Sequence, residues 1–288
     1  KPNIKSDHFV GKYYVIFCEK AKENPKLEEE AQEMLRKWES GDKEIIALWK
    51  KMNTWAVKGF DETYAKFNLE FKKVYNESEI YTKGRDIVNE GVKKGVFIKE
   101  ENGSIIADLE TKGFGKKVLL REDGTSVYIT QDIYLAKVKY EDFKYDYSIY
   151  VVGNEQEFHF KVLFELFKLL GYTFADKCYH LSYGMIYLPH GRMKSREGTV
   201  VDADELLAEM EELAENEVKK RYPALSDKEI NRRAKIIGTG ALRFFILQYD
   251  PVRDFVFNPE ESISFEGETG PYVQYAYARC DSMLKKSK

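Results

Sequence analysis

A short positive segment, GRMKSREGTVV, spans residues 191–201 and is the first candidate for chemistry. Arg192, Lys194 and Arg196 lie within five residues of one another on a stretch that contains glycines. Positive side chains on such a loop could bind a polyphosphate and stabilise the charge that develops on it during group transfer. Gly198 would let the backbone approach that ligand closely. A solvated surface turn accounts for the same residues, and composition alone favours it.

Two carboxylates lie in segments that we expect to come at the ends of strands. Asp132 ends the segment TSVYITQD, where Tyr128 and Thr130 lie just ahead of it, and Glu77 lies in YNESEIY. Asp132 could bind a guanidinium or ammonium group through charge-assisted hydrogen bonds, with Glu77 as a second anion. An ordinary helix N-cap accounts for Asp132 as well, and the local pattern favours that alternative.

A third candidate group follows the apolar run SIYVV at residues 148–152. Gly153 ends this run, and Gln156 and His159 lie at i and i+3 in the first turn of a predicted helix, so they share one face. A helix histidine whose hydrogen bonds are simply satisfied within the protein is the commoner case.

The charge, the cysteines and histidines, and the motifs that are missing argue against several classes of protein. The 288 residues carry a formal net charge of −3, so a nucleic acid would need a local basic patch. The three Cys and four His form no CxxC or HExxH pattern, which argues against a disulfide framework, a protein-bound metal and an oxidising compartment. We find no P-loop, GxSxG or GxGxxG motif, no signal peptide and no membrane-spanning run.

Alternating strands and helices must position these groups. The buried-type strand 148–152, the helix 156–170 and the strand 179–183 predict an α/β fold with a parallel sheet, in which SIYVV would be buried on both faces. Ligands of such sheets gather at the carboxyl ends of strands, where residues 153–156 and 184–201 lie. Around this sheet the sequence predicts a strand at 69–75, a helix at 84–94, mostly antiparallel strands at 96–130, a helix at 132–140, and helices from residue 202 onward. It also predicts helix caps at Asp42 and Ser226 and the start of a helix near Asp61.

In this order the segments resemble one family, the arginyl-tRNA synthetases, which are class I aminoacyl-tRNA synthetases. Seven segments carry the resemblance: DHFVGKYYV (7–15), WESGDKEIIALW (38–49), ESEIY (77–81), DGTSVYITQDIYLA (123–136), IYVVGNEQEFHF (149–160), GRMKSREGTVV (191–201) and SFEGETGPYVQYAYAR (264–279). The resemblance covers nearly the whole chain, and it implies a Rossmann-like nucleotide-binding sheet with insertions, followed by an all-α region.

The resemblance gives the loop at 191–201 a role. It occupies the position of the family's KMSKS motif, which holds the ATP phosphates, with Met193 at the motif's Met. Lys194 takes the place of the motif's Ser, and Ser195 that of its second Lys. Lys194 and Arg196 are therefore the residues expected to contact pyrophosphate.

The resemblance also assigns the substrate sites. Arginine would be bound by Glu77, Tyr128, Asp132 and Gln156. Two carboxylates suit a guanidinium, which carries five donors and a permanent charge, and they would reject neutral analogues. The ATP site would include Gly153, His159, Gly184 and Met185. Binding of tRNA would involve Tyr272, Gln274 and Arg279 on the last helix, where core packing is the alternative for Tyr275 and Tyr277.

The implied reaction activates L-arginine with ATP and transfers it to the 3′-terminal adenosine of tRNA(Arg), with Mg²⁺ on the phosphates and no protein-ligated metal. We expect a cytoplasmic monomer. The family's HIGH motif does not occur here and should lie upstream of Lys1, so we expect a fragment that also lacks most of the anticodon-binding domain. Two alternatives stay open: a non-catalytic RNA- or arginine-binding module, and a class I synthetase with another substrate.

The same resemblance suggests a division of the chain. The expected parts are a helical insertion (1–48), Rossmann-like catalytic parts (49–80 and 125–190), a mostly β insertion (81–124), the KMSKS-like loop with a helical stem-contact region (191–265), and the start of the α-helical anticodon-binding domain (266–288).

Overall fold

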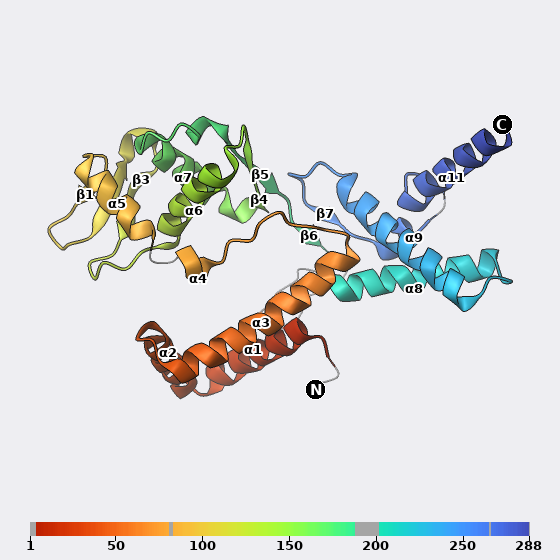
Figure 1. The fold of residues 1–288 in the computed structure, drawn as a ribbon, viewed down its shortest axis with the longest axis horizontal. Coiled ribbons are helices and arrows are strands. Elements are labelled where there is room, and N and C mark those ends of the chain that lie inside the picture. Colours follow the sequence, from red (N-terminus) through yellow and green to blue (C-terminus); the bar gives the residue numbers. More distant parts are fainter. Residues whose placement is uncertain (1–3, 81–82, 188–201, 265, 288) are drawn as a thin grey trace. The chain divides into compact units, whose positions relative to one another are not determined.

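The computed structural model describes residues 4–80, 83–187, 202–264 and 266–287. The chain divides into two compact units (Figure 1). The first comprises residues 1–70, 186–249 and 256–288, and the second comprises residues 71–185 and 250–255. In the described ranges, no helix combines the length and the apolar character that crossing a membrane requires.

The first unit begins with three helices that pack on one another (Figure 1). They are α1 (Ser6–Glu23), α2 (Lys26–Glu39) and α3 (Lys43–Lys66). Gly41 adopts φ +86° and ends the preceding turn, and the Asp42 carboxylate then caps α3 by accepting from Glu44 N and Ile45 N, both at 3.0 Å. The capping that the sequence predicts at Asp42 is confirmed. The helix expected to start near residue 61 is instead the last part of α3.

The same unit contains a second helical group. Its elements are β6 (Ile186–Tyr187), α8 (Ala203–Arg221), α9 (Asp227–Leu247), α10 (Pro259–Ser262) and α11 (Gly270–Lys286). Strand β7 (Phe255–Val256) pairs with β6, and its second residue belongs to this unit. Helices α8 and α9 pack closely at Gly238, where a Cβ would lie 2.9 Å from the backbone of Met210. The Ser226 hydroxyl caps α9 by accepting from Glu229 N. The helical character predicted from residue 202 onward is confirmed.

The second unit holds two sheets. A three-stranded antiparallel sheet has the order β1 (Ile98–Lys99), β2 (Ile105–Leu109), β3 (Gly115–Leu120). A separate parallel pair joins β4 (Ser148–Gly153) to β5 (Cys178–Tyr183), with Ser148 opposite Cys178 and Gly153 opposite Tyr183. The helices are α4 (Glu77–Ile80), α5 (Gly84–Lys93), α6 (Tyr128–Phe143) and α7 (Glu157–Leu169). The predicted parallel strands and α/β class are confirmed.

The core of this unit lies where α5, α6 and α7 meet the strands. Its most deeply buried side chains are Val88, Leu119, Ile133, Leu163, Leu166 and Phe167. Ile149 and Val151 of β4 point to the opposite face of the strand, and 59% and 62% of their surfaces are exposed. The prediction that SIYVV is buried on both faces is therefore wrong for the described chain, because the helices cover one face of this strand.

Two other predictions about strands are wrong. Residues 69–75, which the structure describes, form neither helix nor strand. The helix expected from residue 132 begins instead at Tyr128, so residues 128–130 are helical, whereas the sequence predicted a strand there. Thr130 explains this start, because its buried hydroxyl donates to Leu119 O at 2.6 Å and fixes the first turn of α6 against β3.

Candidate functional site

Asp132 and His159 form the central contact of the candidate site. Asp132 lies on α6 and His159 on α7, and His159 Nε2 is 2.7 Å from Asp132 Oδ2. Their side chains are 38% and 27% exposed, so a ligand can reach them. Val127 is the N-cap of α6, so the interpretation of Asp132 as a helix cap is wrong. The interpretation of His159 as a histidine with a satisfied partner is confirmed.

Tyr128 and Gln156 lie on the same helices as this pair. Tyr128 precedes Asp132 by one turn of α6, so the two share a face, and 78% of its surface is exposed. Gln156 ends the short 3₁₀ turn Asn154–Gln156, which follows β4, and it is the N-cap residue of α7, one turn before His159. The contact between Asp132 and His159 thus brings together the candidate residues on α6 and those that follow β4.

Glu77 is exposed at the start of α4, which packs against α6. The segment before it is attached to α6 at Asp142, whose carboxylate accepts from Lys73 Nζ and, at 2.5 Å, from the Tyr75 hydroxyl. The hydrogen bond from Lys73 lowers the pKa of the Asp142 carboxyl, and the same bond raises the pKa of the Lys73 ammonium. Glu77 therefore lies on an element held beside α6, although no contact between its carboxylate and Asp132 or Tyr128 is present among the described residues.

Gly184 and Met185 follow β5 and pack against residues 250–254. Gly184 N donates to Pro251 O at 2.8 Å, and Met185 N donates to Asp254 Oδ1 at 2.6 Å. A Cβ on Gly184 would lie 2.2 Å from the backbone carbon of Arg253. Packing therefore already requires glycine here, and both N–H groups have partners within the protein. A role of Gly184 and Met185 in ATP binding stays a prediction.

The four candidate residues of the positive loop lie outside the described residues. They are Met193, Lys194, Ser195 and Arg196. The described chain resumes at Asp202, whose carboxylate caps α8 by accepting from Asp204 N at 2.8 Å.

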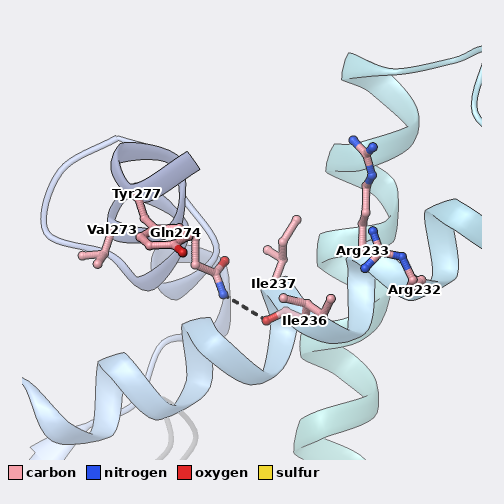
Figure 2. Close-up of a pocket in the computed structure, with 7 residues that line it drawn as sticks. All are labelled: Arg232, Arg233, Ile236, Ile237, Val273, Gln274 and Tyr277. Atoms are coloured by element: carbon pink, nitrogen blue, oxygen red, sulfur yellow. Dashed lines mark hydrogen bonds between the residues drawn. The ribbon is translucent and has the colours of Figure 1, made fainter. Parts of the chain in front are cut away.

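Helix α11 carries the three residues predicted to contact tRNA. Figure 2 shows Gln274 reaching from α11 to α9, where its Nε2 donates to Ile236 O at 3.1 Å. Gly240 leaves room for this amide, because a Cβ there would lie 2.2 Å from Gln274 Nε2. Gln274 thus joins two helices and lines an open groove between them, together with Arg232, Arg233, Ile236, Ile237, Val273 and Tyr277.

Most of the other side chains of α11 are exposed, although Pro271 is buried and Asp281 half-buried. Tyr272 is accessible, and Arg279 Nη1 donates to the Tyr275 hydroxyl at 3.1 Å. Tyr275 and Tyr277 are exposed in the described chain, so core packing of these two side chains has no support among the described residues.

One group of potential metal ligands occurs in the described residues. Asp7, His8 and Asp204 bring their ligand atoms within 4.8 Å of one another. The ammonium of Lys5 already bonds to Asp7 at 2.9 Å and to Asp204 at 2.5 Å, so a cation is built into the cluster. These residues do not fit a resident Mg²⁺. Local sequence patterns do not predict this cluster, since its members come from distant segments and only the pair Asp202 and Asp204 at a helix start marks it.

The family model and the similar proteins all point to the same family. Residues 7–259 match the family model described as "tRNA synthetases class I (R), catalytic domain". The chain is 52% identical over 290 residues to the Arginine--tRNA ligase of Treponema denticola, covering 99% of this chain and 49% of that protein. It is 48% identical over 303 residues to the Arginine--tRNA ligase of Parabacteroides distasonis, covering 98% of this chain and 51% of that protein. The chain thus spans about half the length of the curated relatives it matches.

Solved structures agree on the fold. The arginyl-tRNA synthetase of Plasmodium falciparum has a TM-score of 0.74 at 21% identity, with 91% of this chain and 44% of that chain covered. The Thermus thermophilus arginyl-tRNA synthetase has a TM-score of 0.70 at 21% identity, with 96% of this chain and 56% of that chain covered.

Proposed function

Because the chain belongs to the family of class I (R) tRNA synthetase catalytic domains, we propose that it is part of an arginine–tRNA ligase. The enzyme would activate L-arginine with ATP and transfer it to the 3′-terminal adenosine of tRNA(Arg). The relatives with this name match the chain from end to end, although they are about twice as long.

The observation that carries the proposal is the Asp132 carboxylate held by His159 and flanked by Tyr128. The contact to His159 uses Oδ2 and orients the carboxylate. Oδ1 can then accept from the substrate guanidinium, whose planar donors suit a carboxylate. Glu77 would add the second anion, and Gln156 would contact the same substrate. A site with two such anions penalises a neutral analogue, since charge would be left unpaired.

ATP would lie at the carboxyl ends of β4 and β5. Gly153, His159, Gly184 and Met185 would surround the adenosine, and Lys194 and Arg196 would contact the phosphates, with Met193 and Ser195 in the same loop. Mg²⁺ bound to the phosphates would add charge neutralisation. No step requires a metal bound by Asp7, His8 and Asp204, where Lys5 supplies the positive charge.

The chemistry needs no side-chain nucleophile. An oxygen of the arginine carboxylate forms a bond to the α-phosphorus, the bond from that phosphorus to the bridging oxygen breaks, and pyrophosphate leaves with the electron pair. A ribose hydroxyl of the terminal adenosine then attacks the arginyl carbonyl and displaces AMP. The protein contributes by positioning the reactants and by stabilising phosphoryl charge.

The proposal also covers the contacts with tRNA, the oligomeric state and the cellular location. Tyr272, Gln274 and Arg279 would contact tRNA from α11, where Gln274 also holds α11 on α9. We further propose that the protein is a cytoplasmic monomer and that the functional divisions follow the ranges expected from the sequence.

We expect the full-length protein to catalyse ATP–pyrophosphate exchange in the presence of tRNA and arginine. Each of the other standard amino acids should support much weaker exchange, because they lack the guanidinium. The assay follows labelled pyrophosphate entering ATP. Exchange that depends best on another amino acid would identify a different class I synthetase, and binding of arginine or tRNA without any exchange would favour the non-catalytic module.

A further inference from the structure

The first turn of α6 is bound to strand β3 through Thr130. Thr130 is completely buried, and its hydroxyl donates to Leu119 O at 2.6 Å. The backbone N–H of Val127, the residue before the helix, donates to the same oxygen at 3.4 Å. Tyr128 and Asp132, which the proposed function places at the substrate arginine, each lie two positions from Thr130. The location of these two side chains therefore depends on β3.

Helix α5 also packs closely on Thr130. A Cβ on Gly84, the first residue of α5, would lie 2.7 Å from Thr130 O and 2.8 Å from Thr130 Cγ2. The first turn of α6 is therefore in close contact with both α5 and β3. A buried hydroxyl needs a hydrogen-bond partner, and loss of the bond to Leu119 would loosen this turn on the side of β3.

The first turn of α7 also contacts β3 and the residue before it, through Phe158. The Phe158 and Phe114 ring centroids are 5.8 Å apart in an edge-to-face arrangement, and Lys117 Nζ lies 4.6 Å from the Phe158 ring centroid. Both kinds of contact are attractive. Phe114 immediately precedes β3, and Lys117 lies within it. Phe158 lies between Gln156 and His159 in the sequence, so these contacts hold the turn that carries both.

The two contacts lie close together on one strand. Leu119 bonds to α6 and Lys117 contacts α7, and two positions along a strand correspond to about 7 Å. Pairing with β2 holds β3 in place, with Lys117 opposite Ala107. The contact between Asp132 and His159, at 2.7 Å, requires α6 and α7 to be correctly placed relative to each other. Because β3 contacts both helices beside these residues, it fixes that placement.

We propose that β3 positions the arginine site, with Thr130 and Phe158 as the positioning residues through which it acts. This inference rests on the proposed function, in which Asp132 and Gln156 bind the substrate. Thr130 holds the first turn of α6 and Phe158 holds that of α7, and neither needs to touch arginine. A misplacement of about 1 Å can reduce a rate about 100-fold, so contacts that place the two helices should affect catalysis.

The first test is Thr130→Val in the full-length protein, assayed by ATP–pyrophosphate exchange with tRNA and arginine. Valine keeps the volume and the branched Cβ but removes the hydroxyl. We expect KM for arginine to rise about 10-fold and the preference for arginine over citrulline to narrow, with KM for ATP within about twofold of wild type. The two substrates should differ because no residue proposed to contact ATP lies on α6.

Two matched variants separate the lost hydrogen bond from other effects of the replacement. Thr130→Ser keeps the hydroxyl and should keep KM for arginine within about twofold of wild type. Thr111→Val makes the same replacement at an exposed position in the 3₁₀ turn between β2 and β3, and it should leave both KM values unchanged.

The second test is Phe158→Leu, which removes the ring but keeps an apolar side chain at a position that is 54% exposed. Gln156 is proposed to bind arginine and His159 to bind ATP, so KM for both substrates should rise about 3-fold to 10-fold. Phe158→Tyr keeps the ring and should have wild-type constants. Because Phe158 lies near the surface, its variants are expected to fold even if Thr130→Val does not.

The two variants should therefore give different patterns, with KM for arginine alone raised in Thr130→Val and both KM values raised in Phe158→Leu. If the contacts were only structural, the folded variants would have lower urea midpoints but wild-type KM for arginine and wild-type preference over citrulline, and the positioning role would be overturned. Wild type is assayed in the same series. A wild type without arginine-dependent exchange would contradict the proposed function itself, whereas normal exchange in every variant would contradict only the role of β3.

Discussion

Replacing Asp132 with asparagine should reduce arginine-dependent ATP–pyrophosphate exchange by about 100-fold to 1000-fold. Asparagine has nearly the same shape, so the packing of α6 is retained, but the substrate guanidinium would lose the charged partner proposed for it. Leaving one member of a desolvated charge pair without its partner costs about 3–5 kcal/mol, and each 1.4 kcal/mol corresponds to a factor of ten. The loss should appear as a higher KM for arginine together with a lower kcat.

The matched control for this prediction is Glu141→Gln, on the exposed surface of the same helix. It removes a carboxylate of α6 far from His159 and should change exchange less than twofold. Citrulline, the neutral analogue of arginine, gives a second readout, because the preference of Asp132→Asn for arginine over citrulline should narrow. A variant with wild-type KM for arginine and unchanged discrimination would remove Asp132 from the arginine site and leave it as a partner of His159 alone.

The contact of Asp132 with His159 could not be predicted from the sequence. Local spacing predicted that Gln156 and His159 share a face, which the start of α7 at Glu157 supports. The distance between Asp132 and His159 depends on how α6 packs on α7, and the two residues are 27 positions apart. From the sequence, Asp132 is expected to bind arginine and His159 to bind ATP, and no hydrogen bond between them is predicted.

Local patterns predicted the helices more reliably than they predicted isolated strands. Asp42 and Ser226 cap helices as expected, since a cap depends on residues within one turn. Residues 69–75 have the alternation of a strand, but a strand needs a partner. The structure instead attaches this segment to Asp142 through Lys73 and Tyr75. The β-branched pattern before Asp132 was overridden in the same way, by the buried bond of Thr130 to Leu119.

Replacing Gly184 with alanine should destabilise the protein by about 3 kcal/mol or more. The new Cβ would lie 2.2 Å from the backbone carbon of Arg253 and 2.5 Å from Asp254 N. Backbone atoms cannot move aside as the end of a flexible side chain can, so the cost should reach the upper part of the range for overpacked sites or exceed it. The shift would also disturb the bond from Met185 N to Asp254. Chemical denaturation of wild type and variant measures the change.

Gly11→Ala is the matched control, because nothing lies within 4 Å of a Cβ at Gly11 in the middle of α1. Alanine there should stabilise the protein by about 0.5–1 kcal/mol, since it lowers the entropy of the unfolded chain. The pair also separates two roles of Gly184. If Gly184→Ala leaves the free energy of unfolding within about 0.5 kcal/mol of wild type but raises KM for ATP, the glycine is required by the nucleotide. If stability falls as expected, packing against Arg253 is sufficient to explain it, and contact with ATP must be tested at Met185.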